Sequence, residues 1–94
     1  MAREQFQNLT EPMYYILMAL LQECCGVDIM EKVRVLSDGR VKVGPGTLYA
    51  MLSKFEKSRI ICLTAEEGRR KSYVITEQGR EMLKREYELL YFIL

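Results

Sequence analysis

The chain has 94 residues, of which 49% are hydrophobic and 29% charged, and its net charge is +1. This balance is typical of a folded globular domain and argues against intrinsic disorder. No apolar run approaches the roughly 20 residues of a membrane helix, and the polar N-terminus does not resemble a signal peptide, so a cytoplasmic protein is expected.

Histidine is absent and there are three cysteines. Without histidine, the common zinc sites and the Ser-His and Cys-His catalytic arrangements are excluded, so no enzyme, catalytic residue, metal ligand or cofactor is predicted. Cys24 and Cys25 are adjacent and Cys62 is distant in sequence, which is a poor disulfide framework and indicates reduced thiols. For Cys24 and Cys25, burial as small apolar residues is favoured over a thiol sensor.

The small net charge hides an uneven distribution. Residues 1–31 carry a net charge of −4, residues 32–71 a net charge of +6, and residues 72–94 a net charge of −1. A basic block inside a nearly neutral protein is suited to presenting one positive face to a phosphate backbone. A solvated face without a partner is the alternative that charge alone leaves open.

Two helices are predicted in the first part of the chain. The first lies within Leu9 to Leu21, with Thr10 as its N-cap and Pro12 in its first turn. Its residues MYYILMALL are apolar almost all round, which indicates a buried scaffold helix. The second, apolar on one side only, covers Val27 to Leu36 and ends at the turn signal Asp38-Gly39.

Arg40 to Val43 alternates basic and apolar residues and predicts one very short strand. A third helix is predicted from Pro45 to Ser58, with Gly44 at the N-cap position. Its apolar stripe at helical spacing consists of Leu48, Met51, Leu52 and Phe55. Its opposite, polar and basic face consists of Thr47, Tyr49, Ala50, Ser53, Lys54 and Lys57.

A β-hairpin is predicted next, because Ile60 to Ala65 and Ser72 to Thr76 are both β-branched and apolar. Residues 66–71, EEGRRK, are expected to form its tip, with Gly68 at the bend. Three successive cations at this tip repel one another, and a nearby polyanion would relieve that repulsion. They are Arg69, Arg70 and Lys71.

The last helix is predicted from Glu77 onward with Thr76 as its N-cap. Apolar side chains recur along it at coiled-coil spacing, and the chain ends on YFIL. Burial of this apolar end against a second copy is favoured over folding back onto the chain's own core. The residues assigned to this dimer interface are Leu83, Tyr87, Leu90, Tyr91 and Leu94.

This order of elements predicts a mainly α domain with a small β-hairpin (α+β), namely a winged helix-turn-helix. A single domain over residues 1–94 is expected, with the winged helix at about 9–76 and a C-terminal dimerisation helix at about 77–94. In this architecture the third helix enters the DNA major groove, and the hairpin, the wing, reaches the flanking backbone or minor groove. The basic residues fall on these two predicted elements.

The segments themselves resemble the PadR family of bacterial transcriptional regulators. The resemblance rests on PGTLY at residues 45–49, followed some 20 residues later by GRRKSYVITEQG at residues 68–79, and it extends from about Leu9 to Leu83. It implies a homodimeric repressor that places two recognition helices in successive major grooves of a palindrome. It also leaves open a small aromatic effector between the subunits, for which the candidate residues are Tyr14, Tyr15, Tyr87, Tyr91 and Phe92.

A DNA-binding surface is therefore predicted, in which the third helix reads the groove and the other cations contact phosphates. Its residues are Arg40, Lys42, Thr47, Tyr49, Ser53, Lys54, Lys57, Arg69, Arg70 and Lys71. Asn, Gln and Arg are missing from the exposed face of the third helix, so shape readout is expected to be substantial. Two alternatives are a thiol-based redox or metal sensor that uses Cys24 and Cys25, and a winged helix that serves protein contacts only.

Overall fold

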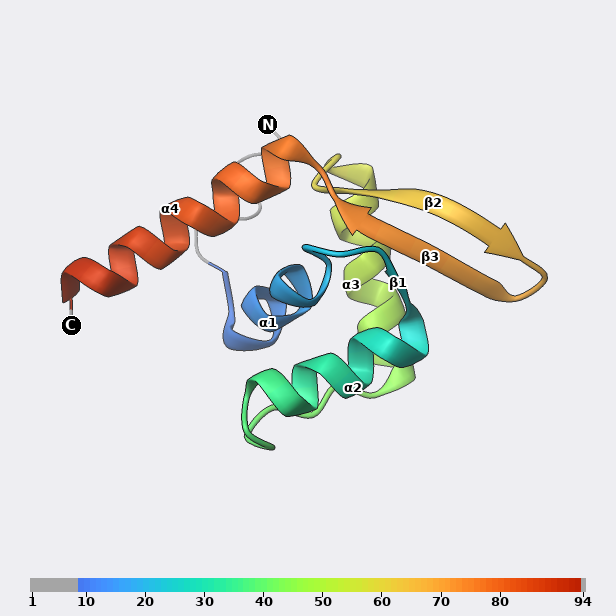
Figure 1. Ribbon diagram of the computed structural model, residues 1–94, viewed down its shortest axis with the longest axis horizontal. Helices are drawn as coiled ribbons and strands as arrows, with labels where there is room; N and C mark the ends of the chain where they lie inside the picture. The colour runs from blue at the N-terminus through green and yellow to red at the C-terminus, as the bar shows by residue number, and fades with distance from the viewer. Residues whose placement is uncertain (1–8, 94) are drawn as a thin grey trace.

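The computed structural model describes residues 9–93, with side chains through residue 88. Four helices and a three-stranded antiparallel sheet follow one another in the chain (Figure 1). Their order is α1 (Glu11–Ala19), β1 (Cys24–Cys25), α2 (Gly26–Leu36), α3 (Pro45–Lys57), β2 (Ile61–Glu67), β3 (Arg70–Ile75) and α4 (Glu77–Ile93). In the sheet, β3 lies between β1 and β2.

The predicted helix starts are confirmed by the cap geometry. The Thr10 side chain accepts a hydrogen bond from the Met13 backbone N–H at 3.4 Å, and a proline occupies the first turn of α1. Gly44 is the N-cap of α3, again followed by proline, whose missing N–H costs little at that position. Helix α2 begins at Gly26, one residue earlier than predicted.

The core forms where α1, α2 and α3 pack together beside the sheet. Leu48, Leu52 and Phe55 of α3 are fully buried, as the apolar stripe predicts, while Met51 is half-buried at the edge of the core. The central part of α1 is buried as well, which confirms it as scaffold. Burial of this stripe fixes which face of α3 is left toward solvent. None of the helices within residues 9–93 is long and apolar enough to cross a membrane.

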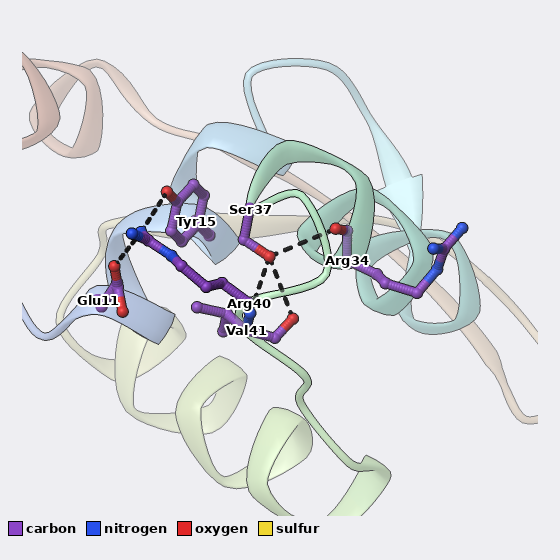
Figure 2. Close-up of polar contacts among 6 residues, drawn as sticks. All are labelled: Glu11, Tyr15, Arg34, Ser37, Arg40 and Val41. Atoms are coloured by element: carbon purple, nitrogen blue, oxygen red, sulfur yellow. Dashed lines mark hydrogen bonds and ion pairs between the residues drawn. The ribbon is translucent and has the colours of Figure 1, made fainter.

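The predicted strand at Arg40 to Val43 is wrong. Val41 and Val43 are buried as the alternation predicts, but their segment pairs with no strand. The backbone of Val41 forms hydrogen bonds with the Ser37 side chain instead. The Ser37 hydroxyl accepts from the Val41 N–H at 2.9 Å and lies 3.3 Å from the Val41 carbonyl oxygen (Figure 2). The strand that pairs with this edge of β3 is β1, in which Cys24 lies opposite Tyr73 and Cys25 opposite Ser72.

The predicted hairpin is present and is longer than expected. Glu66 lies opposite Lys71 and Glu67 opposite Arg70, so these charged residues extend the two strands and do not form a loop. Only Gly68 and Arg69 make the turn, and the φ of +61° at Gly68 fits the first central position of a type II′ turn. Opposite charges across the strands favour this extension. The hairpin of β2 and β3 is the wing, and the domain is a winged helix-turn-helix.

Helix α4 is joined tightly to the end of the wing. The Thr76 hydroxyl accepts from the Gly79 N–H at 3.1 Å, which confirms Thr76 as the N-cap. The same hydroxyl can donate to the carbonyl oxygens of Arg59 and Ile60, which lie 2.7 and 2.9 Å away. A Cβ atom on Gly79 would lie 2.3 Å from the Ile60 carbonyl oxygen, so only glycine fits there. From this junction α4 extends away from the wing (Figure 1).

Thr76→Val is expected to lower the free energy of unfolding by about 1 kcal/mol, because valine keeps the shape of the side chain and removes the hydroxyl together with all its hydrogen bonds. Urea denaturation followed by circular dichroism measures this loss. Thr76→Ser retains the hydroxyl and is the control, so similar losses for the serine and valine variants would contradict the capping role.

Candidate nucleic-acid interface

The outward face of α3 is polar and accessible. Four of its predicted contact residues, Thr47, Ser53, Lys54 and Lys57, are exposed. Because α3 turns once every 3.6 residues, Gly46 and Ala50 lie among these side chains and are exposed too. These two small residues were not among the predicted contacts, since neither carries a polar group. Because their side chains are so small, a partner could approach the backbone of α3 closely at these two positions.

Tyr49 lies at the edge of this face nearest the wing. Its side chain is 49% exposed, so it is available to a partner. At the same time its phenol covers Gly26 at the start of α2. A Cβ atom built on Gly26 would lie 2.6 Å from the Tyr49 hydroxyl oxygen and 3.1 Å from its Cζ atom. Tyr49 therefore combines surface exposure with packing against α2.

The three predicted wing cations have different surroundings. The Lys71 ammonium lies 4.0 Å from a carboxylate oxygen of Glu66. The neighbouring side chains of Cys25 and Asp28 raise the pKa of Arg70. Arg69 stands in the exposed turn, and no ion pair to it is found among residues 9–88. Arg69 is thus the wing cation whose charge is most available to a partner.

A hollow of about 370 Å³ lies where α2, α3 and the wing meet. It joins Tyr49 to the wing cations and to the first turn of α2. Sequence reasoning missed the contribution of α2, because nothing in its pattern shows which elements its N-terminus meets. The 68% exposure of the apolar Val27 became visible only in the fold. The lining residues are Cys25, Gly26, Val27, Asp28, Tyr49, Arg69, Arg70 and Lys71.

The two remaining predicted contacts precede α3. Arg40 does not join the wing cations, because its guanidinium donates to the Glu11 carboxylate and, at 3.3 Å, to the Tyr15 hydroxyl (Figure 2). It ties the segment between α2 and α3 to the start of α1. Lys42 is exposed in the same segment.

The predicted burial of Cys24 and Cys25 is confirmed. The Cys24 thiol donates to the Ala19 carbonyl oxygen at 3.6 Å, and its burial raises its pKa. The Cys25 thiol donates to an Asp28 carboxylate oxygen at 3.3 Å and lines the hollow. Cys62 is exposed on β2. Within the described residues, no group of three or more Cys, Asp or Glu side chains is placed to hold a metal ion.

The predicted dimer residues are only partly accessible. Leu83 is 8% exposed and belongs to the core of its own chain, so its assignment to the dimer seam is corrected. The first turns of α4 pack against that core, and α1 supplies part of the surface they cover. Tyr87 is 57% exposed. The predictions for the Leu90 and Tyr91 side chains and for Leu94 lie outside the described residues.

The geometry suits a double helix. An α-helix fits the major groove of B-form DNA, which is about 12 Å wide. The polar and basic face of α3 is turned outward, and the wing brings further cations to the edge of that face through the shared hollow. Such a surface offers hydrogen-bonding groups for base edges and cations for phosphates.

Comparison with known proteins supports the same conclusion. The sequence model of the Transcriptional regulator PadR-like family matches residues 16–85. Transcriptional regulator YqjI from Escherichia coli is 29% identical over 63 residues, which cover 67% of this chain and 30% of that protein. The chain spans less than a third of the length of the first curated relatives it matches, 13% and 30%.

Solved structures share the fold. A transcriptional regulator from Clostridium thermocellum is 25% identical with a TM-score of 0.71, and the match covers 88% of this chain and 86% of that one. RosR from H. salinarum is 20% identical with a TM-score of 0.77, and the match covers 89% of this chain and 76% of that one. Both matches extend over nearly the whole domain.

Proposed function

The chain belongs to the transcriptional regulator PadR-like family, and from this premise we propose that it is a homodimeric repressor that binds a palindromic DNA operator. Helix α3 enters the major groove and reads base edges through Thr47, Ser53 and Lys54. Tyr49 lies at the edge of the groove, and Lys57 and the wing cations contact phosphates.

One observation carries this proposal. Tyr49, at the edge of the outward face of α3, lines a common hollow with the three wing cations, so this helix face and the wing adjoin each other. The wing part of the basic block thereby lies beside the recognition helix. Cations on such a surface release counterions from DNA when they bind, which supplies affinity without reading sequence.

The dimer is the second part of the proposal. Helix α4 projects from the domain and presents Tyr87 to solvent. A second copy that covers this face would place two recognition helices on one side of a duplex, as a palindrome requires. The space for a small aromatic effector is proposed to lie beside this interface. Tyr14 and Tyr15, two of its predicted residues, pack edge to face with ring centroids 5.8 Å apart.

Selection of bound fragments from a random DNA pool tests the proposal directly. We expect enrichment of a site with two-fold symmetry, together with an affinity that falls steeply as salt rises. No enrichment over a pool selected without protein would overturn the DNA-binding function. Enrichment of a site without symmetry would keep DNA binding and reject the dimer. A reporter gene placed behind the selected site then tests repression.

A further inference from the structure

We propose that the first turn of α2, residues 25–28, is a positioning element that sets where Tyr49 of α3 and Arg70 of the wing lie relative to each other. This inference rests on the proposed DNA-binding function. It assigns a role in operator selectivity to residues that need not touch the DNA themselves. Two different contacts from the same turn carry it, one steric and one electrostatic.

The steric contact is made by Gly26. Its φ lies outside the left-handed region, so the backbone at this position does not itself require glycine. The space above it does, because a Cβ atom would lie 2.6 Å from the Tyr49 hydroxyl oxygen. Real Cβ atoms do not approach a neighbour so closely, so any larger residue at position 26 displaces the phenol. The absence of a side chain on Gly26 thus decides where the Tyr49 ring rests.

The electrostatic contact is made by Cys25 and Asp28, which flank Gly26 and Val27 in the sequence. The Cys25 thiol donates to the Asp28 carboxylate at 3.3 Å, and both residues line the hollow together with Arg70. An opposite charge beside a guanidinium favours one placement of a side chain that is otherwise free to swing. Arg70 is held toward α2 in this way, while Arg69 next to it stays in the exposed turn.

The sheet makes this arrangement stiff. Cys25 is the last residue of β1 and lies opposite Ser72 of β3, while Cys24 lies opposite Tyr73. The chain then passes directly from β1 into α2 (Figure 1). This short segment therefore adjoins both DNA-facing elements, Tyr49 through Gly26 and the wing through Cys25. The spacing between groove contacts and phosphate contacts is set by α2, and the wing alone does not determine it.

Gly26→Ala tests the steric contact. The atom that must move is the far end of a flexible side chain, so we expect the variant to fold and its affinity for the selected operator to fall about tenfold, within the range of coupled contacts. Tyr49→Phe removes the atom at 2.6 Å and leaves the next at 3.1 Å. In the Tyr49→Phe background, Gly26→Ala is therefore expected to weaken operator binding less than about threefold.

Asp28→Asn tests the electrostatic contact. Because Asp28 is exposed, this substitution is expected to leave the fold intact. Loss of one negative charge raises affinity for every duplex, so the informative quantity is the ratio of operator to random-duplex affinity. We expect this ratio to fall about threefold or more. Asp38→Asn is the matched control, because Asp38 is exposed, lies outside the hollow and has a φ of 55° that asparagine tolerates. The control is expected to keep the ratio.

Nuclear magnetic resonance of the free protein separates this inference from the proposed function. Gly26→Ala is expected to shift the ring resonances of Tyr49, and Asp28→Asn to shift the backbone amides of Arg69 and Arg70. Both shifts without any operator binding would support the positioning role and reject the DNA-binding function. Normal operator binding with unchanged ratios and no coupling to Tyr49→Phe would overturn the positioning role.

Discussion

Replacing Arg69, Arg70 and Lys71 together by alanine is expected to weaken binding to any duplex by about a hundredfold at moderate salt. The logarithmic dependence of affinity on salt is expected to flatten by about 0.9 for each lost phosphate contact. Binding titrations at several salt concentrations measure both quantities. The base preference at the centre of the operator is expected to persist, because cations on phosphates position a protein without reading sequence.

The three cations are not expected to contribute equally. Arg69 has no ion pair within the described side chains, so its replacement removes the most available charge. The loss from Arg70 is expected to be smaller, because it shares the hollow with the Asp28 carboxylate, whose negative charge offsets part of its own. The ion pair of Lys71 with Glu66 is exposed and 4.0 Å long, so it is weak and leaves most of the Lys71 charge available to DNA.

A matched control distinguishes the effect of the wing cations from the effect of lowering the net charge. Helix α4 extends away from the wing and carries three exposed cations, so their replacement by alanine removes the same charge at a different place. An equal loss of affinity in both triple variants would show a general charge effect. An unchanged salt dependence in the wing variant would remove the wing from the interface. The control residues are Arg80, Lys84 and Arg85.

Gly79→Ala is expected to lower the free energy of unfolding by about 1 to 3 kcal/mol, although alanine has the better helix propensity. A Cβ atom at this position would lie 2.3 Å from the Ile60 carbonyl oxygen and 2.7 Å from a side-chain carbon of Ile75. The first of these atoms belongs to the backbone, so it yields only if α4 moves away from the domain. Urea denaturation measures the loss.

Gly46→Ala is the control for this prediction. Gly46 also lies in the first turn of a helix, but no atom is within 4 Å of its Cβ position. Alanine there is expected to raise stability by up to about 1 kcal/mol, through its better helix propensity alone. Equal effects at Gly46 and Gly79 would mean that the close packing of α4 on Ile60 is not rigid.

Much of the fold could be predicted from local signals. Thr10, Gly44 and Thr76 mark the starts of three helices, and each of them is an N-cap in the structure. The i, i+3, i+4 spacing from Leu48 to Phe55 identified the buried face of α3, and with it the exposed one. These signals are reliable because each acts within one or two turns of the chain, where neighbouring residues meet whatever the rest of the fold does.

The errors have a common origin in contacts between distant segments. Arg40 to Val43 alternates like a strand, but a strand exists only beside a partner, and the partner position beside β3 is filled by Cys24 and Cys25. Leu83 has the spacing of a dimer seam, but its side chain is buried in the core of its own chain. Apolar periodicity shows that a side chain is buried and does not show by which surface.

The sequence by itself therefore determined the helices, the hairpin, the basic middle region and the outward face of α3, since these follow from short-range periodicity and composition. Only the tertiary structure decided which cations are available and which are already paired, as the contrast of Arg69 with Arg40 shows. It alone brought the first turn of α2 against Tyr49 and into one hollow with Arg70. Those contacts join residues more than 20 positions apart, and their distances depend on how whole elements pack rather than on any local pattern.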